Sequence, residues 1–364
     1  MSGSIAMVQS PILYMSEYLS NKIRVLSALL ILMVLYIHMY YTEGSGNLFI
    51  LENIVGGGFC SVAVPLFYLI SGYLFFLKVP DGLSSILQKM KKRCRTLLIP
   101  YLVANILTFL FYAVLNVIMW RVSAIDKVVN FKVLDVLMEK GLWATLELVF
   151  IAPPIAFQLW FVKYLMVVIL FSPLIYFALK YVVTKTVYIR LAVAILLVVF
   201  IYDHTMLAQA VFWFVAGGLF AMARTGIENK RYGKFTTAFI TALYVFLSVG
   251  AAIGILAPEW KRYIPLVGVP AIWLLYDLVA DYNRKAVEGE LVLFFSKYTF
   301  FVYLCHEPLL NIFKKTPLLI SRSETMFIAS YLIIPILFYL AACLLGYCCR
   351  SIAPRLYSIY TGGR

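Results

Sequence analysis

Charged side chains are scarce in this sequence. Only 13% of its 364 residues are Asp, Glu, Lys or Arg, whereas soluble domains contain about a quarter. Hydrophobic residues make up 63% of the chain. So little charge cannot cover the surface of a soluble globular protein. The polar segments are also too short to bury a core of their own, so we expect one membrane domain over residues 1–364 and no fused soluble domain.

Acidic residues are even scarcer than basic ones. The sequence has 17 Asp and Glu against 31 Lys and Arg, which gives a net charge of +14. No basic stretch is interleaved with aromatic residues in the manner of proteins that bind RNA or DNA, and we expect no nucleic-acid partner. In membrane proteins Lys and Arg gather in cytoplasmic loops. We therefore expect the basic residues to contact membrane lipids.

Histidine and cysteine are too few for common metal sites. The chain has three histidines (His38, His204 and His306) and six cysteines without CxxC spacing. A protein metal site usually needs three or four converging ligands. The sequence therefore predicts no metal site, and most of the cysteines are expected to be small apolar packing residues.

Long apolar runs, by contrast, are abundant. A membrane-spanning helix needs about 20 mainly apolar residues, because lipid cannot hydrogen-bond to an exposed backbone. We therefore predict an all-α fold, a polytopic transmembrane bundle of about ten helices. The ten segments are 24–42, 57–78, 98–120, 158–180, 186–202, 205–222, 235–257, 263–280, 291–313 and 325–349.

The basic residues predict the orientation of this bundle. If the N-terminus is cytoplasmic, most of the Lys and Arg residues fall on the inner side, as the positive-inside rule requires. We therefore expect both termini in the cytoplasm and a multi-pass protein of the inner or plasma membrane. The one sizeable outer loop is 121–157. Within it, residues 131–149 show helical spacing of apolar side chains, which indicates an amphipathic helix on the outer surface.

The three histidines are predicted to share one depth in the membrane. His38 lies about 21 Å above Arg24 at 1.5 Å per residue. His306 lies similarly far into the ninth segment, and His204 sits in the outer turn between the fifth and sixth. Ionisable residues inside a membrane are costly and usually functional, and His38 is the strongest candidate because its helix is otherwise apolar. Glu307 follows His306, but helical neighbours point about 100° apart and need not share a site.

A basic cluster spans Lys89–Arg95, directly before the third segment. It has two open interpretations. It is a cytoplasmic anchor for anionic lipid head groups, or a phosphate site in which the planar guanidinium groups of Arg93 and Arg95 donate paired hydrogen bonds. Arg24, at the start of the first segment, is a further candidate for binding phosphate.

Five stretches, taken in order, resemble the membrane acyltransferase 3 family, whose members transfer acyl groups to sugars and other surface molecules. Together they span residues 24–309. In this chain, Arg24 stands about one helical turn further from His38 than is usual in the family. The stretches are the helix from Arg24 to His38, then Pro65–Tyr73, Arg93–Tyr101, Leu159-Trp160-Phe161 and Tyr303–Leu309.

The resemblance implies an O-acyltransferase, most simply an O-acetyltransferase. Its co-substrate would be acetyl-CoA or another acyl-CoA arriving from the cytoplasm, with no permanently bound cofactor. The phosphates of this donor would meet Arg24, Arg93 and Arg95. His38 would act as a general base or carry the acyl group briefly, since imidazole titrates near neutral pH.

The resemblance also adds His306 and Glu307 as further catalytic candidates. The implied acceptor is a hydroxyl of a surface or exported polysaccharide, or of its lipid-linked precursor. The candidate contacts with this substrate are Ser71, Trp160 and His204, and polysaccharide synthesis or export machinery is the expected partner. An alternative is a polysaccharide or lipid-linked sugar transporter or export subunit without catalysis. Transporters often have duplicated halves, and this sequence contains no internal repeat.

Overall fold

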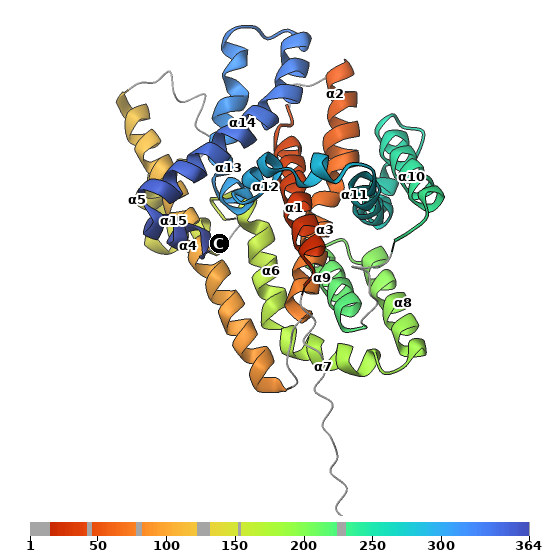
Figure 1. Cartoon of the computed structure of the whole chain (residues 1–364). Helices are drawn as coiled ribbons and strands as arrows, with labels where there is room; N and C mark the ends of the chain where they lie inside the picture. Colours follow the sequence, from red (N-terminus) through yellow and green to blue (C-terminus); the bar gives the residue numbers. More distant parts are fainter. Residues whose placement is uncertain are drawn as a thin grey trace, which may run out of the picture.

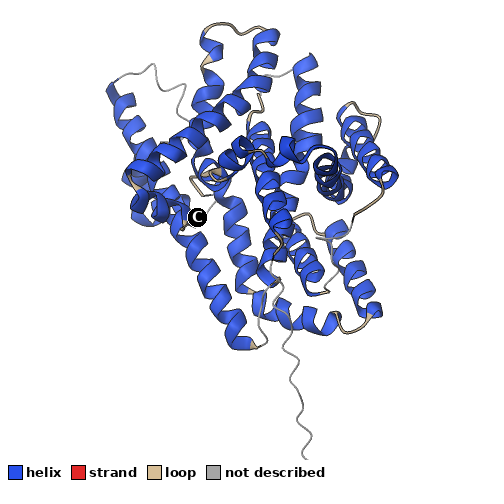
Figure 2. Ribbon diagram, in the orientation of Figure 1, coloured by secondary structure: helices blue, strands red, loops and turns tan. Residues whose placement is uncertain are grey.

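The computed structural model describes residues 15–41, 46–77, 82–121, 132–151, 154–223 and 231–363. Every regular element in this part of the chain is a helix, as Figure 2 shows. The all-α prediction is therefore confirmed. Some residues of the predicted inner side, including the N-terminal residues 1–14 and the basic residues Lys78, Arg224 and Lys230, lie outside the described residues. The orientation of the bundle stays a prediction.

Fifteen α-helices, labelled α1 to α15, follow one another along the described chain, and Figure 1 shows α1 running through the middle of the assembly. Their bounds are α1 Glu17–His38, α2 Gly46–Glu52, α3 Ala63–Phe76, α4 Leu83–Arg121, α5 Val133–Leu146, α6 Trp160–Leu170, α7 Ser172–Val182, α8 Thr186–Tyr202, α9 Met206–Met222, α10 Lys234–Ala252, α11 Ile264–Glu288, α12 Glu290–Ser296, α13 Thr299–Lys315, α14 Glu324–Ile352 and α15 Pro354–Thr361.

Several of these helices are long and apolar enough to cross a membrane. Among the described residues there are six such runs, and a seventh if α6 and α7, which are bent by 63°, count as one span. Helices α8 and α9 are shorter apolar helices. Together with the α12–α13 segment, these elements follow the order of the ten predicted segments. The chain is a multi-pass membrane protein, and the number of ten crossings stays a prediction.

The third predicted segment begins too late. Helix α4 starts at Leu83, so the basic stretch Lys89–Arg95 lies inside the early turns of this helix and not before it. Residues two apart on a helix point about 200° apart. Arg93 and Arg95 are therefore directed to different sides of α4.

A helix also forms within the predicted outer loop. Helix α5 occupies Val133–Leu146, and residues 122–131 of the loop lie outside the described residues. Val133 packs in a small apolar cluster with Val149 and Ile155. The placement of α5 on the outer membrane surface stays a prediction.

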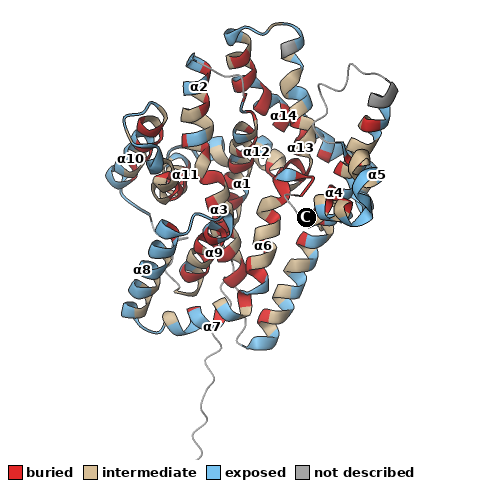
Figure 3. Ribbon diagram, turned by 180° about the vertical axis from the view of Figure 1, so that it is seen from behind, coloured by how far each residue is buried: buried red, intermediate tan, exposed pale blue. Residues whose placement is uncertain are grey.

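Buried residues are concentrated in the central helices, including α3 and α9, whereas α7 and α8 lie at the edge of the bundle (Figure 3). Within α8, Phe200 is the only buried residue, and apolar side chains such as Leu191 and Ile195 are more than half exposed. A peripheral helix that exposes apolar residues all round is suited to contact with lipid.

Helices α3 and α9 approach each other closely through glycine. A Cβ atom at Gly72 would lie 1.9 Å from the backbone oxygen of Phe214, and one at Gly217 would lie 2.0 Å from that of Leu69. Only glycine permits this backbone contact, which is a common way for helices to associate in membranes. The contact fixes α3, and with it Ser71, relative to the centre of the bundle.

A buried ion-pair network joins α1 to α11. Nζ of Lys22 lies 2.7 Å from Oδ1 of Asp277, and these side chains are only 2% and 10% exposed. The Tyr18 hydroxyl donates to the same oxygen at 2.6 Å, and Arg231 lies 2.8 Å from it. The Lys22 ammonium also lies 3.8 Å from the centre of the Trp273 ring. Because charges buried this deeply need partners, the network fixes the position of α1 against α11.

Candidate active site

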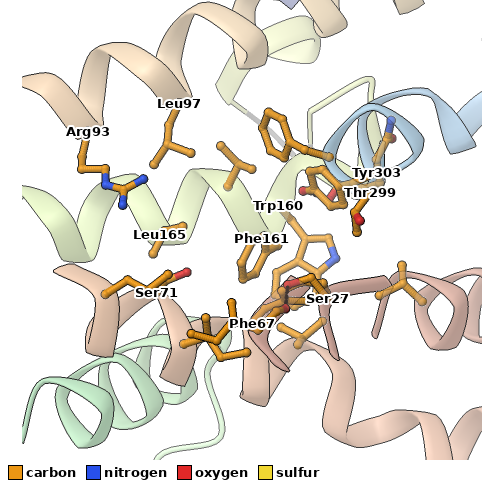
Figure 4. A pocket seen from close by; sticks show the side chains of 18 of the residues that line it. Ser27, Phe67, Ser71, Arg93, Leu97, Trp160, Phe161, Leu165, Thr299 and Tyr303 are labelled. Carbon is orange, nitrogen blue, oxygen red and sulfur yellow. Dashed lines mark hydrogen bonds between the residues drawn. The ribbon is translucent and has the colours of Figure 1, made fainter. Parts of the chain in front are cut away.

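A cavity of about 530 Å³ lies between α1, α3, α4, α6 and the α12–α13 segment. Its walls are mostly aliphatic and aromatic. Figure 4 shows Arg93 of α4 and Ser71 of α3 at one end, with Trp160 and Tyr303 toward the other. The polar and ionisable residues on its wall include Arg24, Ser27, His38, Ser71, Arg93, Gln158, Ser296, Lys297, Thr299 and Tyr303.

The ionisable residues are separated along the cavity. Arg24 and His38 are about 21 Å apart along α1 at 1.5 Å per residue. Lys297 lies just before α13, and His306 lies further along that helix. The α12–α13 segment runs in the same direction as α1. Its first part, α12, packs against α1, and its later residue His306 meets His38 at the end of α1. Arg24 and Lys297 are therefore at one end, and His38 is at the other.

Three cations line this cavity. Arg24, Arg93 and Lys297 come from α1, α4 and the residue after α12. In the part of the chain that the structure describes, none of their side chains forms an ion pair or a hydrogen bond. Cations that share one cavity wall are suited to an anionic group, and guanidinium groups are especially suited to phosphate.

At the other end, His38 meets Glu307 and His306. Nδ1 of His38 lies 3.7 Å from Oε1 of Glu307, and the rings of His38 and His306 are 4.9 Å apart between centroids. His38 lines the cavity, whereas Glu307 and His306 are not on its wall. Oε2 of Glu307 accepts a hydrogen bond from Asn311 at 2.7 Å. The imidazole thus stands between the cavity and a carboxylate, an arrangement that suits a general base.

The geometry of α13 explains why both neighbours reach His38. Glu307 has φ −103° and ψ 132°, which is not helical, and Pro308 follows it. On a regular helix His306 and Glu307 would point about 100° apart and need not share a site, but α13 is not regular at this pair. The break turns the Glu307 carboxylate to the same side as the His306 ring.

His306 is held in one tautomer. Its Nδ1 lies 2.8 Å from the backbone oxygen of Tyr303, and a carbonyl oxygen only accepts, so Nδ1 carries the proton. Nε2 is then an acceptor, and within the described residues it has no partner. His306 is fully buried. This enclosed imidazole packs against the His38 ring and is not on the cavity wall.

Arg95 and His204 are not brought to this cavity. Arg95 is exposed on α4, on a different side of the helix from Arg93. His204 is exposed in the turn between α8 and α9, with Nε2 2.8 Å from NH1 of Arg262, and it lines a separate cavity of about 250 Å³. Ser71 and Trp160 do line the main cavity. No three His, Cys, Asp or Glu side chains gather as a metal site among the described residues.

Lys297 and Gln158 are among the residues of the cavity wall that sequence reasoning missed. Lys297 is a lysine within a predicted apolar segment, and intramembrane charge is itself a signal of function. Gln158 directly precedes the Leu159-Trp160-Phe161 stretch. It is 2% exposed, and its burial depends on contacts with α13 that no local pattern indicates.

Comparison with known proteins agrees with this geometry. A family model described as an acyltransferase domain, Acyl_transf_3, matches residues 21–349. The succinoglycan biosynthesis protein ExoH of Rhizobium meliloti (strain 1021) is 24% identical over 319 residues, covering 82% of this chain and 80% of that protein. No solved structure gives a significant match. Because the family model covers most of the sequence and contains both ends of the cavity, the chain belongs to the acyltransferase 3 family and is a membrane acyltransferase.

Proposed function

We propose that this protein transfers an acyl group, most simply acetyl, from cytoplasmic acyl-CoA to a hydroxyl of a surface or exported polysaccharide or its lipid-linked precursor. The observation that supports this proposal best is that one cavity wall includes both His38 and the three cations that have no partner among the described residues. The similarity to a protein of succinoglycan biosynthesis supports a glycan acceptor. We place the protein in the inner or plasma membrane, alongside polysaccharide synthesis or export machinery.

The phosphates of the donor bind Arg24, Arg93 and Lys297 in this proposal. The aliphatic and aromatic wall between the cations and His38 suits an extended pantetheine arm. Arg95 is exposed and off the cavity wall, so the lipid-anchor interpretation suits it better. The acyl thioester then lies beside His38.

In this proposal His38 acts first as a general base and then as a general acid. Nε2 of His38 takes the proton from the acceptor hydroxyl while its oxygen attacks the thioester carbonyl. The C–S bond then breaks, and the proton passes from His38 to the leaving thiolate of CoA. The carboxylate of Glu307, on the Nδ1 side at 3.7 Å, stabilises the imidazolium by its charge. The Ser71 hydroxyl and the Trp160 indole remain candidates for substrate contact on the cavity wall.

The decisive experiment replaces His38 by Ala and follows the acyl group in the cell-surface glycan by mass spectrometry. We expect incorporation to fall to background, with a normal amount of protein in the membrane. Undiminished acylation at a normal protein level would contradict the catalytic role. The mass of the group added by the unaltered protein distinguishes acetyl from succinyl or longer donors.

A further inference from the structure

The break in α13 is closed by a side chain from another segment. Pro308 has no N–H group, so the carbonyl of Leu304 loses the donor that an unbroken helix would supply. Nε2 of Gln158 donates to this carbonyl at 3.1 Å. The same nitrogen donates to the backbone carbonyl of Glu307, also at 3.1 Å. One carboxamide therefore holds the backbone on both sides of the break, including that of the residue whose carboxylate faces His38.

The orientation of the Gln158 carboxamide is fixed by chemistry. Carbonyl oxygens only accept hydrogen bonds, so the amide nitrogen must face Leu304 and Glu307. Its oxygen Oε1 is buried and has no partner in the described part of the chain. The Tyr303 hydroxyl donates to the backbone oxygen of Gln158 at 2.7 Å, which ties this segment to α13 a second time. Because Oε1 is unpaired while both N–H groups are used, the side chain contributes through its donors.

Gln158 also adjoins the reacting end of the cavity. It lies in a short helical turn, Phe157–Leu159, that leads into α6, and it lines the cavity itself. The ring of its neighbour Phe157 packs edge-on against His38, with 5.9 Å between ring centroids. The same turn therefore contacts the imidazole on one side and the backbone of its carboxylate partner on the other.

We infer that Gln158 is a positioning residue, which fixes the backbone of Glu307 and so sets the Glu307 carboxylate against His38. This inference rests on the proposed function, because the position of Glu307 matters for turnover only if the His38–Glu307 pair performs acyl transfer.

The test is a double-mutant cycle between Gln158→Met and Glu307→Gln, with kcat and KM measured on purified protein. Methionine keeps the length of the side chain but removes both donors. We expect Gln158→Met alone to lower kcat about 10- to 100-fold, the scale expected for a misplaced catalytic group. KM for acyl-CoA should stay within about threefold, since the cations proposed to bind the donor phosphates are unchanged. In the Glu307→Gln background, the added loss should be less than about threefold, because the two residues act as a unit.

If Gln158→Met lowers kcat by the same factor in the unaltered protein and in Glu307→Gln, the role of Gln158 is merely structural and the inference is overturned. An unchanged kcat for Gln158→Met would also overturn it. If the methionine variant does not fold, Gln158→Asn takes its place in the same cycle, since the shorter amide cannot span both carbonyls. Gln88→Met is the matched control, on an exposed position of α4. Full activity of Glu307→Gln alone would instead overturn the proposed pair. If Glu307→Gln lowers kcat and Gln158→Met leaves it unchanged, only the positioning role of Gln158 is overturned.

Discussion

Nδ1 of His38 lies 3.7 Å from Oε1 of Glu307, although the two residues come from helices at opposite ends of the chain. His38 is the last residue of α1, and Glu307 lies at the break in α13. This relationship gives the imidazole a carboxylate on one side and the cavity on the other.

Replacing Glu307 by Gln keeps the size of the side chain and removes its charge. We expect kcat to fall about 100-fold, within the range for a group that supports general base catalysis. Donor affinity should change little, because Glu307 is not on the cavity wall. Steady-state kinetics on purified protein checks this. Glu259→Gln, at an exposed position, is the control, and an unchanged kcat for Glu307→Gln would show that the carboxylate is not part of the chemistry.

The cavity cations should bind the donor, and Arg95 should not. Replacing Arg93 or Lys297 by Ala should weaken acyl-CoA binding about tenfold or more, since hydrogen bonds to charged groups contribute about 1.5–3 kcal/mol each. Arg95→Ala should leave binding unchanged, because this side chain is exposed and points away from Arg93. Calorimetry in neutral detergent without anionic lipid isolates donor binding from anchoring. Equal effects of the Arg93 and Arg95 changes would contradict the assigned cavity.

The α3–α9 contact should not accept a side chain. Gly72→Ala and Gly217→Ala each place a methyl group on a backbone oxygen of the opposite helix, and overpacking of this kind costs about 1–3 kcal/mol. We expect a lower Tm for both variants in detergent. Gly233→Ala is the control, because a Cβ there meets nothing within 4 Å. An unchanged Tm for Gly72→Ala would mean that the helices are further apart than the structure places them.

Removing one charge of the Lys22–Asp277 pair should lower the stability of the protein more than removing both charges. Asp277→Asn leaves the buried Lys22 ammonium without its partner, which typically costs about 3–5 kcal/mol. The double variant Lys22→Met, Asp277→Asn should recover part of this loss. Thermal unfolding of the three proteins measures the difference. A double variant less stable than Asp277→Asn would argue against charge pairing as the reason for the coupling.

The fold class followed from the sequence because it depends on composition and run length. Apolar runs of spanning length admit only helices in lipid, and the observed helices follow the order of the predicted segments. The boundaries were harder. Helix α4 extends to Leu83 through a basic stretch that composition alone assigned to a loop, because helix propensity does not end where hydrophobicity does.

The sequence predicted how far along its segment each candidate histidine lies, and it did not predict which side chains meet. The sequence alone determined that His38 lies about 21 Å along its segment from Arg24, and that His306 lies similarly far into its own, because each residue adds a fixed 1.5 Å of rise. Only the tertiary structure decided that they meet, that Glu307 joins them and that His204 does not. Lateral position depends on packing between distant segments, such as the hydrogen bonds from Gln158 to the break in α13, and no local pattern encodes such contacts.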